Sequence, residues 1–109
     1  MFEKDTNSHS NHQDKRLLLK PFVFGDLQLP NRIVMAPLTR MRAPLPGAVP
    51  NELMREYYEQ RATAGLIISE GTFVSDQARG WFGAPGVYTE AQRKGWQSVT
   101  DAVDRKSVV

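Results

Sequence analysis

Two short stretches place small and hydroxyl-bearing residues directly after apolar runs. The first stretch continues from "IVM" into Ala36, Pro37, Leu38 and Thr39, and the second continues from "LIISE" into Gly71. An apolar floor, a hydroxyl donor and a glycine that permits close backbone approach would suit a planar ligand with polar edges. From the residues alone, the simpler interpretation is that Thr39 bonds its own turn and that Gly71 marks a bulge or a tight contact.

Charged residues accompany both stretches. Arg40 and Arg42 follow Thr39, and Glu70 precedes Gly71. Because a buried carboxylate needs a partner, we expect Glu70 to form a structural ion pair with Arg40. The two arginines could instead bind a phosphate, but no glycine-rich strand-to-helix turn of the G-x-G-x-x-G or P-loop kind accompanies them.

The loop "RGWFGAPG" carries two large aromatic residues, Trp81 and Phe82. We expect both to be exposed, where they either pack on the rim of the fold or line a pocket. The chain has no cysteine, and its two histidines, His9 and His12, lie near the N-terminus. We therefore expect no metal site, and we find no catalytic triad or carboxylate pair.

The apolar runs themselves predict strands. Residues 33–38 are apolar at successive positions, and residues 66–74 have an apolar centre at 66–68, as in strands that are covered on both faces. Residues 17–32 hold two short apolar pieces around Gly25 and Asp26, which predicts a hairpin or an edge ribbon. The final "SVV" resembles the start of a third strand.

Two helices are predicted between and after these strands. Asn51 is a good N-cap for a helix to about residue 64, and Gly65 suits a left-handed position at its end. Thr89 and Gln92 form the signature of a capping box, which opens a helix to about residue 105. The order is hairpin, strand, helix, strand, helix and start of a strand, which predicts a parallel α/β sheet with long loops after its strands.

Composition narrows the class of protein. The chain has 109 residues, of which 14 are basic and 12 acidic, and they are mixed without a basic block. This pattern predicts neither nucleic-acid binding nor attachment to a membrane surface. No apolar run approaches the length of a membrane span or a secretory signal, and we expect a cytoplasmic protein. We interpret residues 1–16 as a disordered polar arm and residues 17–109 as the N-terminal part of a larger α/β domain.

Three motifs in sequence carry a resemblance to a known family. The stretches "LPNRIVMAPLTRMRA", "PGAVPNELMREYYEQRATAGLIISEGTFVS" and "PGVYTEAQRKGWQSVTDAV" are similar to the N-terminal part of the old yellow enzymes. The resemblance covers nearly everything beyond the arm. It implies an FMN-dependent NAD(P)H dehydrogenase or ene-reductase on a TIM (β/α)₈ barrel, of which this chain holds the hairpin and about two and a half β/α units.

The resemblance also implies roles for single residues. The segment of Ala36, Pro37, Leu38 and Thr39 would bind the flavin, with the Thr39 hydroxyl tuning its potential. Gly71 would face the same ring, at a position where many relatives carry alanine. Trp81 would border the substrate pocket, at a position that is often tyrosine.

The implied reaction passes hydride from NAD(P)H through FMN to the β-carbon of an α,β-unsaturated carbonyl or nitro compound. The substrate-binding histidine and asparagine and the proton donor of the family lie outside this chain, so we expect the isolated 109 residues to be incomplete and inactive. One alternative is an inactive fragment or pseudo-enzyme that acts at most as an interaction module. Another is an unrelated barrel enzyme without flavin.

Overall fold

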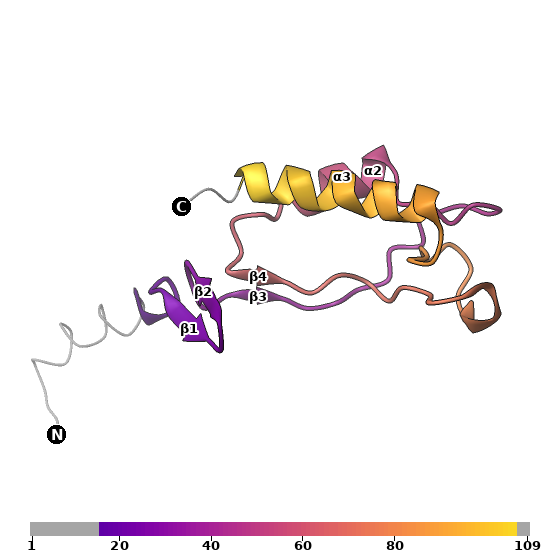
Figure 1. Ribbon diagram of the computed structural model, residues 1–109. Coiled ribbons are helices and arrows are strands. Elements are labelled where there is room, and N and C mark those ends of the chain that lie inside the picture. The colour runs from indigo at the N-terminus through magenta and orange to yellow at the C-terminus, as the bar shows by residue number, and fades with distance from the viewer. Residues whose placement is uncertain (1–15, 107–109) are drawn as a thin grey trace, which may run out of the picture.

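The computed structural model describes residues 16–106 (Figure 1). The expected third strand at "SVV" and nearly all of the expected polar arm lie outside these residues. The elements are β1 (Phe22–Phe24), β2 (Leu27–Leu29), β3 (Val34–Met35), α2 (Glu52–Glu59), β4 (Leu66–Ile67), the short 3-10 helix η1 (Asp76–Ala78) and α3 (Glu90–Lys106).

The first two strands form the predicted hairpin. β1 pairs antiparallel with β2, so that Phe22 lies opposite Leu29 and Phe24 opposite Leu27. Gly25 turns the chain with a φ of 61°, a left-handed conformation that glycine adopts without steric cost. The sequence prediction of a short ribbon around Gly25 is confirmed.

The next two strands form the predicted parallel pair, but they are shorter than expected. Val34 lies opposite Leu66 and Met35 opposite Ile67. One reason is that Pro37 has no N–H to continue the ladder. The later part of the expected second strand pairs elsewhere, because Phe73 forms a parallel bridge with Gly86 in the following loop. The strand bounds predicted from the apolar runs are therefore wrong at their C-terminal ends.

Helix α2 begins as predicted and ends early. The Asn51 side chain accepts the Met54 N–H at 3.0 Å, which confirms the N-cap. The helix ends at Glu59 and continues as tight turns. Gly65 is not in the left-handed region, so that expectation is wrong. Its lack of a side chain is needed for another reason, since a Cβ there would lie 2.2 Å from the Asn31 carbonyl oxygen.

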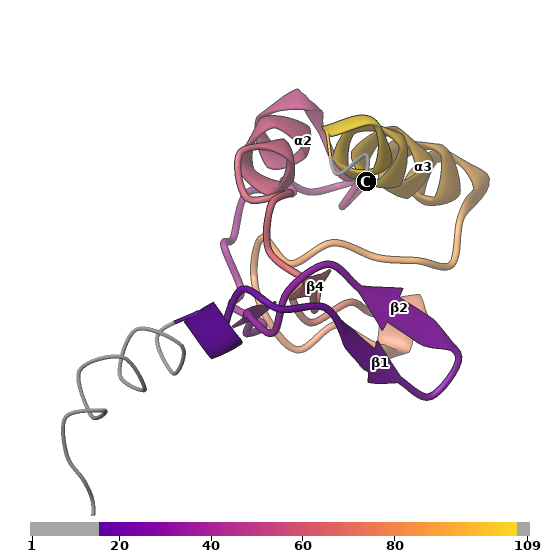
Figure 2. The ribbon, with the colours of Figure 1, turned by 90° about the vertical axis from the view of Figure 1, so that its left-hand side faces the viewer.

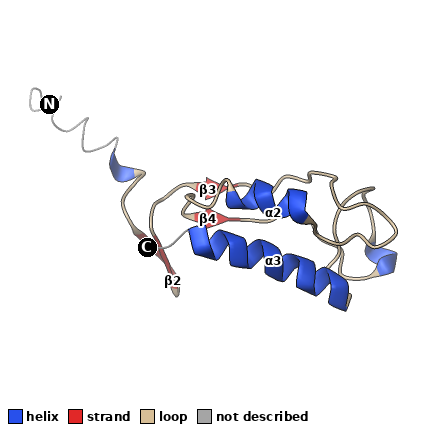
Figure 3. Cartoon of the chain, turned by 90° about the horizontal axis from the view of Figure 1, so that it is seen from above, coloured by secondary structure: helices blue, strands red, loops and turns tan. Residues whose placement is uncertain are grey.

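Helices α2 and α3 lie side by side above the parallel strands (Figures 1 and 2). Seen from above, both helices run along the strand pair (Figure 3). Each helix turns its apolar stripe inward, as expected for helices that cover a sheet. The buried core contains Met54 and Tyr58 from α2, and Val99 and Ala102 from α3.

The other face of the strand pair is open. Val34 and Ile68 are exposed there. Between the hairpin and the strands lies a pocket of about 380 Å³, lined among others by Phe22, Leu66 and Ile68. Residues 16–106 thus form part of an α/β fold and do not close a barrel. No helix within these residues is long and apolar enough to cross a membrane.

Candidate functional site

Thr39 and Gly71 come together on the segments that follow the two parallel strands, four residues beyond the ends of β3 and β4. A Cβ placed on Gly71 would lie 3.9 Å from Thr39 Oγ1, an ordinary contact distance. Thr39 is half-buried, and its hydroxyl makes no hydrogen bond with the described part of the chain. The interpretations that Thr39 bonds its own turn and that Gly71 marks a tight contact are therefore wrong. The strand end presents a free donor beside an open glycine.

The residues before Thr39 present apolar surface. Ala36, Pro37 and Leu38 are exposed, and the Leu38 side chain is 56% exposed. They follow β3 alongside the segment that follows β4 (Figure 1). This arrangement brings an apolar strip next to the hydroxyl of Thr39. That these residues form a flat floor with a polar edge for a planar ligand stays a prediction.

Trp81 shares a pocket with Gly71. The two residues line a shallow hollow of about 240 Å³ together with Thr72, Phe73 and Ala84. Trp81 is 67% exposed and Phe82 70% exposed, as expected for this loop. The indole is therefore available to line a site at the same end of the strands as Thr39.

The long loops after the two strands are fastened to each other. The Ala43 N–H donates to the Gly83 carbonyl at 2.9 Å, and the Gly86 N–H donates to the Ala48 carbonyl at 3.0 Å. The backbones come so close that a Cβ on Gly83 would lie 2.9 Å from Met41 Cα. The two loops thus form one connected rim.

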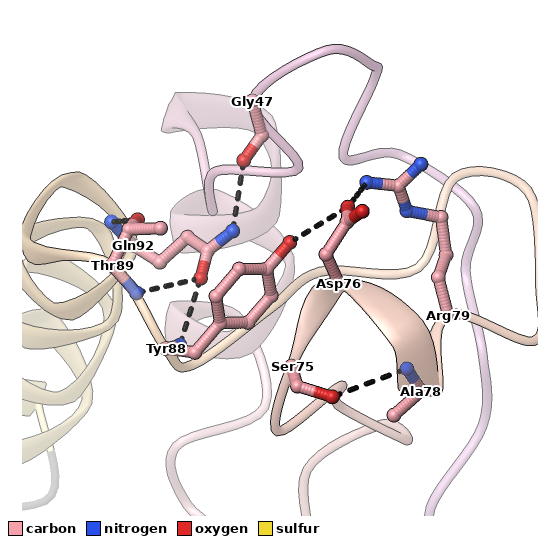
Figure 4. Close-up of polar contacts among 8 residues, drawn as sticks. All are labelled: Gly47, Ser75, Asp76, Ala78, Arg79, Tyr88, Thr89 and Gln92. Atoms are coloured by element: carbon pink, nitrogen blue, oxygen red, sulfur yellow. Dashed lines mark hydrogen bonds and ion pairs between the residues drawn. The ribbon is translucent and has the colours of Figure 1, made fainter.

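Gln92 ties this rim to helix α3 (Figure 4). Its Oε1 accepts the N–H groups of Tyr88 at 2.8 Å and Thr89 at 3.0 Å, and its Nε2 donates to the Gly47 carbonyl at 2.9 Å. The Gln92 N–H donates to Thr89 Oγ1 at 3.1 Å, which confirms the capping box. The side chain is 1% exposed. The sequence predicted the cap but not the bond to Gly47, which lies far away along the chain.

The expected ion pair between Glu70 and Arg40 is wrong. The carboxylate of Glu70 accepts the Tyr58 hydroxyl at 2.8 Å and the backbone N–H of Arg40 at 3.3 Å. The Arg40 guanidinium instead lies over the ring of Tyr57, 4.7 Å from its centroid. Arg42 is also held by backbone, since its Nη1 donates to the Arg40 carbonyl at 3.0 Å.

Tyr58 was missing from the predicted site, although it contacts the residue next to Gly71. It is 2% exposed, and this burial raises the pKa of its phenol well above the ordinary value. A signal was present in the sequence, because Tyr58 follows Met54 by four positions on the apolar face of α2. A buried carboxylate can be satisfied by a hydroxyl as well as by a cation.

Comparison with known proteins identifies the relatives of this chain. A family model described as NADH:flavin oxidoreductase / NADH oxidase matches residues 17–109. A putative 12-oxophytodienoate reductase 2 of Oryza sativa subsp. japonica is 42% identical over 102 residues, which is 93% of this chain and 27% of that protein. Chanoclavine-I aldehyde reductase of Penicillium roqueforti is 46% identical over 91 residues, which is 82% of this chain and 24% of that protein.

Solved structures similar to this chain come from the same group of enzymes. Morphinone reductase superposes with a TM-score of 0.78 and 53% identity, over 82% of this chain and 24% of that chain in its complex with tetrahydroNAD. The old yellow enzyme from Trypanosoma cruzi gives a TM-score of 0.80 and 46% identity, over 85% of this chain and 25% of that chain. The chain thus spans about a quarter of the length of these relatives. FMN and NAD(P)H, which the sequence predicts, are the cofactor and co-substrate of this group. The chain belongs to the NADH:flavin oxidoreductase / NADH oxidase family, among the old yellow enzymes.

Proposed function

We propose that this chain is the N-terminal part of an FMN-dependent ene-reductase built on a (β/α)₈ barrel, with residues 17–109 forming the first strands and helices of that barrel. The observation that carries the proposal is the Thr39 hydroxyl, which makes no hydrogen bond among residues 16–106, beside the open Gly71 on the segments that follow two parallel strands. In (β/α) folds, sites are built at this end of the strands, on the loops that follow them.

The residues at this end fit a flat heteroaromatic ring. Ala36, Pro37 and Leu38 offer exposed apolar surface, and Thr39 offers a donor whose hydrogen bond is not already used. Gly71 leaves space for a ring to approach closely, because only one atom lies within 4 Å of its missing Cβ. A hydrogen bond from Thr39 to a ring carbonyl would stabilise the electron-rich reduced form.

FMN, when bound, supplies the hydride chemistry that connects NAD(P)H to an alkene conjugated to a carbonyl or nitro group. The protein's own residues orient the ring and shape the substrate pocket. Trp81 is exposed and lines a pocket together with Gly71, which supports a role for it at the border of the substrate pocket. We propose that the whole protein acts on such small molecules in the cytoplasm, without nucleic-acid or membrane partners.

The alternative for the isolated chain is that it is catalytically inactive and acts at most as an interaction module. It spans about a quarter of the length of its relatives, and the resemblance to the old yellow enzymes implies that the substrate-binding and proton-donating residues lie outside it. We therefore expect the 109 residues alone to retain little FMN and to leave NADPH oxidation at background level.

An FMN titration tests both statements. Absorbance and flavin fluorescence should show stoichiometric binding by the longest polypeptide that contains these residues, and weak binding by residues 1–109 alone. Oxidation of NADPH or NADH with an α,β-unsaturated ketone then reports turnover. Absence of FMN binding by the longest form would refute the proposal, and turnover by the 109 residues would refute their expected inactivity.

A further inference from the structure

A buried pair, Tyr58 and Glu70, links helix α2 to the segment that follows strand β4. The Tyr58 hydroxyl donates to Glu70 Oε2 at 2.8 Å, and the Glu70 backbone N–H donates to the same hydroxyl at 3.0 Å. Both side chains are 2% exposed. The phenol is therefore both donor and acceptor towards one residue, which fixes the position and direction of the Glu70 carboxylate.

The second carboxylate oxygen of Glu70 bonds the segment that follows strand β3. Glu70 Oε1 accepts the backbone N–H of Arg40 at 3.3 Å. The last regular bond between the strands is that from the Ile68 N–H to the Met35 carbonyl, at 3.1 Å. Among the described residues, the Glu70 carboxylate makes the one hydrogen bond that joins residues 36–40 to residues 68–71. It takes over where the ladder stops.

The hydrogen bonds that join Tyr58, Glu70 and the Arg40 N–H form a clamp between α2 and the two segments after the strands. This clamp lies directly beside the candidate flavin-contacting residues. Arg40 follows Thr39 and Glu70 precedes Gly71, so both ends of the clamp are adjacent in sequence to the pair at the strand ends. Neighbouring residues of an extended chain point to opposite sides. The Glu70 carboxylate accordingly points towards α2 and bonds Tyr58. The next residue, Gly71, instead faces Thr39, because a Cβ built on Gly71 would lie 3.9 Å from Thr39 Oγ1.

The groups that bond the Glu70 carboxylate are neutral, namely the Tyr58 hydroxyl and the Arg40 backbone N–H. No guanidinium bonds it within residues 16–106, since Arg40 lies over Tyr57 and Arg42 is held by backbone carbonyls. The Glu70 carboxylate, itself held by the Tyr58 hydroxyl, therefore restrains the main chain at the residue after Thr39.

We propose that Glu70 and Tyr58 are positioning residues for the flavin. Through the Arg40 N–H they hold the Thr39 hydroxyl opposite Gly71 and so set the strength of its hydrogen bond to the ring. This inference rests on the proposed function. A group held by neighbouring packing and hydrogen bonds keeps its geometry at low cost, whereas small misplacements weaken its effect on the reacting group.

The first test needs no flavin. Hydrogen exchange of the Arg40 amide is measured by NMR in the longest polypeptide that contains these residues. Glu70→Ala should raise the exchange rate about tenfold or more, since it removes the acceptor. Glu70→Gln should restore protection, because an amide oxygen still accepts the N–H. Tyr57→Phe is the matched control and should change nothing. An unchanged rate in Glu70→Ala would overturn the proposal.

The second test reads the flavin. In the FMN-loaded protein, Tyr58→Phe should shift the two-electron reduction equilibrium about tenfold towards the oxidised form, which corresponds to about 30 mV. Tyr57→Phe should leave the midpoint potential unchanged. In a Thr39→Ala background, Tyr58→Phe should add no shift, because its effect passes through Thr39. A shift of the same size in that background would overturn the proposal.

The outcomes separate two failures. A wild-type protein that binds no FMN would refute the proposed function, and with it this inference. A wild-type protein that binds FMN, with a potential unaffected by Tyr58→Phe, would refute the positioning role alone. If Tyr58→Phe fails to fold, the same potential measurement on Glu70→Ala and on its rescuing variant Glu70→Gln decides the matter.

Discussion

Replacing Gln92 with methionine is expected to destabilise the fold by about 3 kcal/mol. Methionine keeps the length and unbranched shape of glutamine and has a similar helix propensity, so neither a cavity nor the helix itself explains a loss. The substitution removes three hydrogen bonds, to the N–H groups of Tyr88 and Thr89 and to the Gly47 carbonyl. Each such bond contributes about 1 kcal/mol net, and the side chain is fully buried.

Urea unfolding followed by tryptophan fluorescence measures this loss. Trp96 is a suitable reporter, because its indole N–H donates to the Gly86 carbonyl at 3.1 Å, close to the Gln92 side chain. Two variants calibrate the result. Thr89→Ala removes a single capping bond and should cost about 1 kcal/mol. Gln97→Met makes the same substitution at an exposed position of α3 and should cost less than about 0.5 kcal/mol.

The reasoning would be refuted if Gln92→Met destabilised the protein no more than Gln97→Met does. That result would mean that water replaces the lost partners, and that Gln92 does not fasten the loop before α2 to the start of α3. A loss equal to that of Thr89→Ala would mean that only the cap matters and that the bond to Gly47 contributes nothing.

Three further predictions concern the strand ends and the buried phenol. Gly65→Ala should cost more than about 3 kcal/mol in thermal unfolding, because its Cβ would lie 2.2 Å from the Asn31 carbonyl oxygen, whereas Gly71→Ala should stay within about 0.5 kcal/mol. Thr39→Ala should slow reduction of the bound flavin by NAD(P)H in stopped-flow absorbance, and Thr39→Ser should restore the rate; equal rates in all three proteins would remove Thr39 from the mechanism. Burial raises the pKa of Tyr58, so its contribution to stability is complete below the unfolded value near 10 and is lost as the pH rises above it; unfolding curves across this range should show a weaker pH dependence in Tyr58→Phe.

Local signals predicted the elements of this fold well. Asn51 and Thr89 each begin a helix, because a side-chain oxygen next to an unpaired N–H is a property of a few consecutive residues. Gly25 marks the hairpin turn by another local property, since glycine adopts a left-handed φ without steric cost. The parallel pairing of β3 with β4 also followed from the alternation of strands and helices.

Features that depend on residues far away in the sequence were predicted less accurately. Gly65 was assigned to a left-handed cap, but its lack of a Cβ serves contact with Asn31, more than thirty positions away. Residues 66–74 predict a single strand, but the structure ends β4 at Ile67 and pairs Phe73 with Gly86. Hydrophobicity shows that a segment is covered, and does not show which segment covers it.

By itself, the sequence determined the order of the hairpin, the parallel strands and the two helices, the N-caps Asn51 and Thr89, and the family. It also placed Thr39 and Gly71 at corresponding strand ends, because parallel strands bring their C-terminal ends together. Only the tertiary structure decided which group satisfies Glu70. Arg40 and Tyr58 were both chemically able to do so, and the choice depends on which face of the strand and which turn of α2 each side chain occupies. Tyr58 points inward from the helix towards the carboxylate, whereas the Arg40 guanidinium lies over Tyr57 and leaves only its backbone N–H to bond Glu70.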